Sequence, residues 1–262
     1  MRDLDLGDTL LPPERLEGFF TSEGLFLKYT VFKPTIISSS DSRPGILLLH
    51  GSSTAAGRGR TLFEGLQIEL SKAGFASFAY DTRGVGESGG QFHDSTLINR
   101  FIDAQNAYEF LVGQEFVDKE KLIILGVSMG GHVAARFVGA YPDRFRGVIL
   151  VNPAAYGLHT EDKRLRPYTE FTDAIAQDLN WRNSLAFSGL SAFQGPIMIA
   201  DSEFDDVIPG DVKELYGLSA NYLEKRLILP EIKHLFFSGT DEASAKAREL
   251  FYSEATSFIR QL

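Results

Sequence analysis

The most informative segment of this 262-residue sequence reads Leu122-Ile123-Ile124-Leu125-Gly126-Val127-Ser128-Met129-Gly130-Gly131. A short apolar run, typical of a buried strand, leads into a serine that has glycines two residues before and after it. A serine on so sharp a strand-to-helix turn needs small neighbours, because bulkier residues would collide there. The start of the following helix directs backbone N–H groups at the place where a tetrahedral oxyanion would form. The segment therefore predicts Ser128 as the nucleophile of an acyl-transfer reaction and the Met129 N–H as an oxyanion donor.

Strand and helix signals alternate on both sides of this segment. The predicted strands are Ile46–Leu49, Ser77–Tyr80, Leu122–Leu125, Val148–Val151, Ile197–Ala200 and Leu227–Leu229. The predicted helices span residues 61–73, 95–113, 129–140, 210–222 and 241–261. Nearly continuous apolar strands separated by helices are typical of a parallel sheet covered on both faces. The pattern predicts a doubly wound, mostly parallel α/β fold.

Two segments depart from this alternation. Near the start, Gly18–Phe20 and Leu25–Phe32 read as two strands joined by Ser22-Glu23-Gly24, which predicts an antiparallel hairpin. Residues 152–194 are of mixed character and read as an insertion, in which Phe171, Ile175 and Leu179 recur every four residues. That spacing predicts a short amphipathic helix, which either patches the core or lies across the rest of the domain. With no linker or internal repeat, the sequence predicts one domain, 1–262, with a small cap insertion.

Composition narrows the classes of function. The chain has 26 Lys and Arg against 35 Asp and Glu, a net charge of −9, and such a charge repels nucleic acid and anionic membranes. The absence of cysteine excludes disulfides, thiolate metal sites and a thiol nucleophile. Residues 1–16 lack the apolar core of a signal peptide, and no apolar run approaches a membrane span. We therefore expect a cytoplasmic protein without cofactor, metal, nucleic-acid partner or membrane partner, of undetermined oligomeric state.

The base and the acid that would serve Ser128 should follow it, because in this arrangement the chain order is serine, acid, histidine. His234 is the one late histidine, and a neutral imidazole can take the serine proton and return it to the leaving group. The strand Ile197–Ala200 leads into several carboxylates. Asp205 is preferred as the acid, because it lies a loop's length past the strand and before the helix signal at 209–210. Asp206 comes next, and the remaining alternatives are Asp201 and Glu203.

Two glycine-containing loops need separate interpretations. His50-Gly51-Ser52 follows the strand Ile46–Leu49, so the Ser52 N–H is the candidate second oxyanion donor, and His50 is expected to be a structural histidine bonded within its loop. Residues 84–89 match G-x-G-x-x-G. However, the motif opens no helix, and Asp103, the acidic residue at about the required distance, falls inside a helical pattern. We therefore reject dinucleotide binding.

The motifs together resemble the α/β hydrolases, and most closely the cinnamoyl and feruloyl esterase-like branch. The residues that carry the resemblance are His50-Gly51, Asp81 to Ser88 (D-x-R-G-x-G-x-S), the turn around Ser128, Asn152-Pro153-Ala154, Asp205 to Pro209, and His234. The resemblance implies Ser128 as nucleophile, Asp205 as acid, His234 as base, and the N–H groups of Ser52 and Met129 as oxyanion hole. It also implies that residues 152–194 form a cap that sets substrate choice.

The chain departs from that branch at Ser52-Ser53 and at Val127 and Met129, positions that flank the acyl pocket. The expected function is that of a carboxylesterase that cleaves small or aromatic acyl esters through an acyl-enzyme. A thioesterase, a peptidase, a carbon–carbon bond hydrolase and an acyltransferase share the same triad and remain alternatives. So does a non-catalytic ligand-binding protein.

Overall fold

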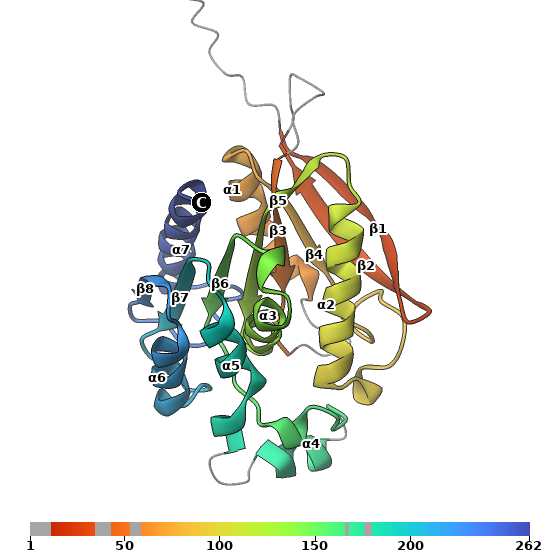
Figure 1. Cartoon of the computed structure of the whole chain (residues 1–262). Coiled ribbons are helices and arrows are strands. Elements are labelled where there is room, and N and C mark those ends of the chain that lie inside the picture. Colours follow the sequence, from red (N-terminus) through yellow and green to blue (C-terminus); the bar gives the residue numbers. More distant parts are fainter. Residues whose placement is uncertain (1–11, 35–42, 53–58, 166–167, 176–179) are drawn as a thin grey trace, which may run out of the picture.

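A single twisted sheet forms the centre of the computed structural model, which describes residues 12–34, 43–52, 59–165, 168–175 and 180–262 (Figure 1). Within these ranges, eight strands are arranged in the order β1-β2-β4-β3-β5-β6-β7-β8. The strands are β1 (Glu14–Ser22), β2 (Leu25–Lys33), β3 (Arg43–Leu49), β4 (Ala76–Tyr80), β5 (Val117–Val127), β6 (Gly147–Val151), β7 (Ile197–Ser202) and β8 (Leu223–Leu229). Strand β2 is antiparallel to both β1 and β4, and the later pairs are parallel. The predicted mostly parallel α/β sheet with an N-terminal hairpin is confirmed.

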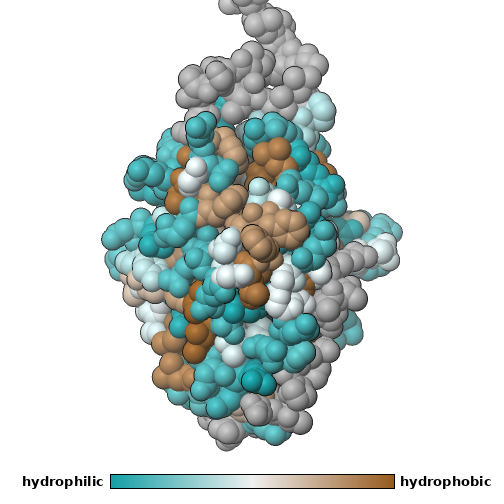
Figure 2. Space-filling view, turned by 90° about the vertical axis from the view of Figure 1, so that its right-hand side faces the viewer, coloured by the Kyte–Doolittle hydropathy of each residue, from teal (hydrophilic) through white to brown (hydrophobic). Residues whose placement is uncertain are grey.

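Two residues form the turn of the hairpin. Glu23 and Gly24 join β1 to β2 with φ angles of +46° and +79°, and two successive left-handed residues match the right-handed twist of the flanking strands. The hairpin lies on the side of the molecule that faces the viewer in Figure 2, where apolar surface is interspersed among polar residues. Phe19 and Phe26 are its exposed aromatic side chains.

Helices cover both faces of the sheet (Figure 1). They are α1 (Glu64–Lys72), α2 (Leu97–Val112), α3 (Met129–Ala140), α4 (Tyr168–Ile175), α5 (Leu185–Ala192), α6 (Gly210–Ser219) and α7 (Glu242–Arg260). Alternate side chains of β3 point into the two core layers, one on each face of the sheet. Ile46 and Leu48 belong to the core cluster of α1 and α7, whereas Leu47 and Leu49 belong to the cluster of α2, α3, α5 and α6. Because the side chains of Ile46–Leu49 are covered on one face or the other, this part of the strand reads as a continuous apolar run.

Helix α5 was not predicted from the sequence. Its residues are almost uniformly apolar or small, so they show no amphipathic period, and the helix is buried against α3. The two helices approach closely because Gly139 of α3 meets Gly189 of α5. A Cβ on either glycine would overlap the backbone of the other helix. The predicted helix at 210–222 is shorter than expected, since α6 ends at Ser219 and the chain then enters the edge strand β8.

In the segment between β6 and β7, helix α4 lies below the carboxyl ends of the strands in the view of Figure 1, whereas α5 packs beside α3. The predicted amphipathic helix is present as α4. Phe171 is buried and joins Met129 in a small apolar cluster, with Ile175 packed against it. Leu179, the third residue of the predicted period, lies outside the described residues. None of the helices in the described ranges combines the length and the apolar character that a bilayer crossing requires.

The close approach of α3 and α5 predicts that Gly189→Ala destabilises the protein. Alanine is normally favoured over glycine in a helix by about 1 kcal/mol, but the added methyl group here meets the backbone of Ala135. We expect the free energy of unfolding, measured by urea denaturation, to fall by about 1–3 kcal/mol. Gly210→Ala is the control, because a Cβ at Gly210 meets nothing within 4 Å and should leave stability equal or slightly higher. Equal stabilities of the two variants would contradict the packing argument.

Candidate active site

Ser128 occupies a strained turn between β5 and α3. Its φ of +54° and ψ of −118° lie in a region that residues with a side chain rarely adopt. Gly126 and Gly130 make the turn possible, because a Cβ on Gly126 would overlap the backbone of Gly130, and one on Gly130 would overlap the Leu49 carbonyl. The Ser128 N–H donates to the Val151 carbonyl at 2.9 Å. The serine is therefore fixed between the ends of three adjacent strands, β3, β5 and β6.

The structure brings Ser128, His234 and Asp205 together from three separate loops. His234 lies in the loop after β8, and its Nε2 is 3.0 Å from Ser128 Oγ. Asp205 lies in the turn after β7, and its Oδ2 is 3.0 Å from His234 Nδ1. A carboxylate only accepts, so Nδ1 carries the proton and Nε2 is left to accept from the serine hydroxyl. The arrangement can accept a proton from Ser128 while keeping the imidazole oriented.

Asp205 is held as a carboxylate with its side chain covered by protein. Its side chain has no exposed surface, and Oδ1 accepts hydrogen bonds from the N–H groups of Val207 at 2.8 Å and Ile208 at 3.0 Å. Burial alone would raise the pKa of this carboxyl, but the hydrogen bond from His234 and the two backbone donors outweigh burial and lower it. Lys213 Nζ adds a positive charge 3.7 Å from Oδ2. Asp205 is thus negative at neutral pH and faces the imidazole.

The three alternative carboxylates are engaged elsewhere. Asp201 is buried and accepts from Arg226 Nε at 3.1 Å. Asp206 is more than half exposed and pairs with Lys233 at 3.0 Å. Glu203 is exposed and accepts from the backbone of the β8 loop. Among the described carboxylates of residues 201–206, Asp205 is the one that contacts His234.

The His50–Ser52 turn borders Ser128. A Cβ on Gly51 would lie 3.0 Å from Ser128 Cβ, so the absence of a side chain lets the turn approach the nucleophile. His50 Nδ1 donates to the Gly51 carbonyl at 2.8 Å, and Nε2 accepts from the Thr82 N–H at 3.2 Å. Burial, followed by the charge of Arg100, lowers the pKa of His50 to about 3, so this histidine is neutral. The structure thus places His50 as a hydrogen-bonded loop residue, and it places Ser52 at the cavity described next.

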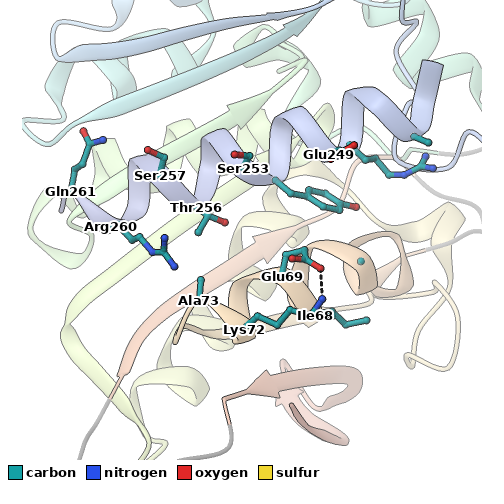
Figure 3. A pocket seen from close by; sticks show the side chains of 14 residues that line it. Ile68, Glu69, Lys72, Ala73, Glu249, Ser253, Thr256, Ser257, Arg260 and Gln261 are labelled. Carbon is teal, nitrogen blue, oxygen red and sulfur yellow. Dashed lines mark hydrogen bonds and ion pairs between the residues drawn. The ribbon is translucent and has the colours of Figure 1, made fainter. Parts of the chain in front are cut away.

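A cavity of about 630 Å³ opens in front of Ser128. Its lining residues are His50, Gly51, Ser52, Leu62, Val127, Ser128, Val207, His234, Leu235 and Ser238. A more voluminous hollow of about 940 Å³ lies between α1 and α7, where Glu69 pairs with Lys72 and Ser253 projects from α7 (Figure 3). That hollow contains neither Ser128 nor His234. Volume alone would favour the larger hollow, whereas the hydrogen-bond chain makes the smaller cavity the candidate active site.

Asn152 is a site residue that sequence reasoning placed in a motif without assigning it a role. It is fully buried at the end of β6 with a φ of +43°, and asparagine tolerates this conformation better than most residues. Its amide nitrogen donates to Ser202 Oγ at 2.9 Å and to the His234 carbonyl at 3.2 Å, and its oxygen accepts from the Ser202 N–H at 2.7 Å. One amide thus connects the end of β7 to the histidine loop. An asparagine directly after a buried strand is the feature of the sequence that could have identified this residue.

A buried cluster that the sequence did not reveal fixes the 152–194 segment to α3. Glu161 accepts from His132 Nε2 at 2.9 Å and from Arg136 at 2.5 Å, and Ser184 Oγ lies 3.3 Å from His132 Nδ1. Both Glu161 and Ser184 are buried. Since His132 follows Ser128 by one helical turn, the insertion is anchored to the helix that the nucleophile begins. Nowhere in the described ranges do three or more His, Asp or Glu side chains converge so that they could hold a metal ion.

The loop that matches G-x-G-x-x-G has a structural explanation. Asp81, just before it, pairs with Arg60, and Arg83 pairs with Asp103 at Nε–Oδ2 3.0 Å. Gly84 is left-handed at φ +73°, and a Cβ there would overlap the backbone of Phe92. The glycines thus allow a compact loop beside two buried ion pairs, and the loop leads into a short 3₁₀ turn at 92–94 instead of opening a long helix.

Comparison with known proteins identifies the family. The family model described as serine aminopeptidase, S33, a group of α/β hydrolases, matches residues 40–194, more than half of the chain. The chain belongs to this family. Its match covers the nucleophile turn and the 152–194 segment, and it stops before Asp205 and His234.

Individual relatives include esterases and peptidases. A monoacylglycerol lipase of Mycolicibacterium smegmatis is 30% identical over 133 residues, 50% of this chain and 44% of the lipase. Est1E of Butyrivibrio proteoclasticus, in its structure with ferulic acid bound, superposes with a TM-score of 0.71 at 16% identity, covering 93% of this chain and 98% of Est1E. The acylaminoacyl peptidase of Pyrococcus horikoshii superposes with a TM-score of 0.73 at 20% identity, covering 96% and 42% respectively. The two superpositions establish the same fold.

The contacts of Asn152 predict a specific stability loss. Asn152→Gly keeps a residue that accepts positive φ but removes three hydrogen bonds and leaves the buried Ser202 N–H unpaired. We expect the free energy of unfolding in urea to fall by about 2–4 kcal/mol. Glu231→Gly is the matched control, because Glu231 has a φ of +56° but an exposed side chain, so glycine there should relieve strain and leave stability equal or higher. A loss below about 0.5 kcal/mol in Asn152→Gly would show that the amide does not hold the two loops.

Proposed function

We propose that the protein is a serine carboxylesterase that hydrolyses small or aromatic acyl esters. The observation that carries the proposal is the continuous hydrogen-bond chain from Ser128 Oγ through His234 to the buried Asp205, which ends in an open cavity. A binding protein needs no such chain, whereas acyl transfer needs all three groups in this order. Membership of a hydrolase family supports the same reaction class.

The acylation step uses the proton arrangement described above. Ser128 Oγ attacks the ester carbonyl carbon while its proton moves to His234 Nε2, and the imidazolium that forms is stabilised by Asp205. The carbonyl oxygen becomes negative and is stabilised by the N–H groups of Ser52 and Met129. Met129 is the first residue of α3, so its N–H has no acceptor within the helix. Collapse of the intermediate breaks the carbon–oxygen bond to the alcohol, which leaves with the proton from His234.

Water completes the cycle. His234 takes a proton from a water molecule, the resulting hydroxide adds to the acyl carbon, and the second tetrahedral intermediate expels Ser128 Oγ, which recovers its proton from His234. The products are a carboxylic acid and the free enzyme.

We further propose that residues 1–262 act as one catalytic domain in which 152–194 forms the cap. Phe171 of α4, which packs with Met129 beside the nucleophile, supports this role.

A peptidase is the second candidate function, because the matching family is described as serine aminopeptidase and a structural neighbour is an acylaminoacyl peptidase. An aminopeptidase must bind the positive N-terminus of its substrate, which calls for a carboxylate near the nucleophile. The described residues that line the cavity include no carboxylate, and Asp205 is already paired with His234. Leu62, Val207 and Leu235 give the cavity an apolar side instead. This lining favours uncharged esters over amino-terminal peptides.

The substrate class is tested with nitrophenyl esters, from acetate to long acyl and cinnamoyl forms, beside leucine and alanine nitroanilides. We expect turnover of short or aromatic esters, and Ser128→Ala should reduce kcat/KM by about 10³-fold or more. Ser253→Ala, which removes a serine in the hollow between α1 and α7, should retain the parent rate. Faster cleavage of the anilides than of every ester would favour the peptidase, and equal rates in parent and Ser128→Ala would exclude Ser128 as nucleophile.

The choice of acid is tested by two neighbouring substitutions. Asp205→Asn keeps the shape of the side chain but removes the charge that orients and stabilises the imidazolium, so kcat on the best ester should fall by about 10³–10⁴-fold. Asp206→Asn breaks an exposed ion pair with Lys233 and should change kcat by less than about twofold. Similar effects of the two substitutions would return the acid role to Asp201 or Glu203.

A further inference from the structure

A buried arginine lies directly behind the His50–Ser52 turn. Arg100 stands in the first turns of α2, whose start is fixed by a capping box between Thr96 and Asn99. Its side chain is only 2% exposed, yet no carboxylate of the described residues lies within ion-pair distance of it. Nε and one terminal nitrogen, NH2, have no hydrogen-bond partner among the described residues. Burial of a charge without a counter-ion is costly, so this position calls for an explanation.

The remaining nitrogen of Arg100 points to the explanation. NH1 donates to the Gly51 carbonyl at 3.2 Å and approaches the His50 carbonyl at 3.5 Å. The same Gly51 carbonyl also accepts from His50 Nδ1 at 2.8 Å. Two buried donors therefore converge on one backbone oxygen. This oxygen belongs to the turn that lies beside Ser128, where Gly51 has no Cβ to prevent the close approach.

Because of peptide geometry, the hydrogen bonds to the Gly51 carbonyl also orient the candidate oxyanion donor, the Ser52 N–H. The Gly51 carbonyl and the Ser52 N–H belong to one planar trans peptide, so they point in opposite directions. Fixing the carbonyl toward Arg100 and His50 therefore fixes the Ser52 N–H on the other side. A positive charge on the carbonyl also polarises the peptide and strengthens its N–H as a donor.

We propose that Arg100 is a positioning residue of the oxyanion hole, which orients and polarises the Gly51–Ser52 peptide so that the Ser52 N–H stabilises the negative oxygen of the tetrahedral intermediate. This inference rests on the proposed serine hydrolase function. No carboxylate among the described residues forms an ion pair with Arg100, which is consistent with this role, because a direct pair would weaken the field that acts on the developing oxyanion. The charge of Asp103, the acidic residue nearest along α2, does act on Arg100, but its hydrogen bonds are to Arg83 and Ser22. Although burial lowers the pKa of Arg100, a guanidinium begins far above neutrality and keeps its proton.

The test separates the oxyanion role from a role in folding. On the best nitrophenyl ester, Arg100→Met should lower kcat per active site by about 10–100-fold with KM changed by less than about threefold, since the contact acts on the transition state. The end point of titration with a fluorophosphonate gives the number of active sites. Affinity for phenyl trifluoromethyl ketone, which forms a tetrahedral oxyanion on serine, should weaken by a factor similar to the loss of kcat.

Two conservative variants keep the inference falsifiable if Arg100→Met does not fold. Arg100→Lys retains charge and a donor, and Arg100→Gln retains only a donor, so kcat should fall in the order parent, Lys, Gln. Arg60→Met is the matched control: it removes a buried guanidinium that pairs with Asp81 and does not touch the Gly51 carbonyl, so stability should fall while kcat per site stays within about twofold.

The outcomes distinguish this inference from the function on which it rests. A parent enzyme that cleaves no ester and takes up no fluorophosphonate overturns both. An active parent whose Arg100→Gln and Arg100→Lys variants keep kcat and ketone affinity within twofold overturns the role of Arg100 alone. A loss of folded protein with unchanged kcat per site would likewise overturn it, because it would show that Arg100 only stabilises the fold.

Discussion

The backbone conformation of Ser128 is the constraint on which the rest of the site depends. A residue with a side chain at φ +54° and ψ −118° costs about 1–3 kcal/mol and persists only where its surroundings enforce it. The surroundings here are the centre of the sheet. Strand β5 delivers the serine, a hydrogen bond to Val151 ties it to β6, and Gly130 lets α3 begin against the end of β3. The glycines allow this close approach. In the sheet, β5 lies between β3 and β6, so the serine turn has a neighbouring strand on each side.

The remaining groups reach Ser128 because parallel strands end at the same edge of the sheet. Asp205 follows β7 and His234 follows β8, so the two loops are neighbours although 28 residues separate them from each other along the chain. Asn152 at the end of β6 joins both loops through one amide. Arg100 donates a hydrogen bond to the Gly51 carbonyl in the turn after β3. Each contact is made by backbone or a buried side chain, so the fold presets the geometry before any substrate arrives.

The sequence was most informative where local chemistry alone restricts the structure. The apolar runs and the glycines around Ser128 were sufficient to predict the sheet and the nucleophile turn. Asp205 could only be preferred over its neighbours, because its hydrogen bonds to Val207 and Ile208 depend on how the loop closes. Arg100 and Glu161 were not recognised, since their partners lie far along the chain. Helix α5 was missed because its residues are almost all apolar or small, so no polar face alternates with an apolar one. The catalytic roles of Ser128, Asp205 and His234 stay predictions.

We expect the hydrogen-bond chain to make Ser128 more nucleophilic than any other serine of the protein. The most direct measurement is to react the purified chain with a fluorophosphonate and locate the adduct by peptide mass spectrometry. We expect one adduct per chain, on the peptide that contains Ser128, formed much more slowly after His234→Ala. An adduct on another serine, or none with excess reagent, would contradict it.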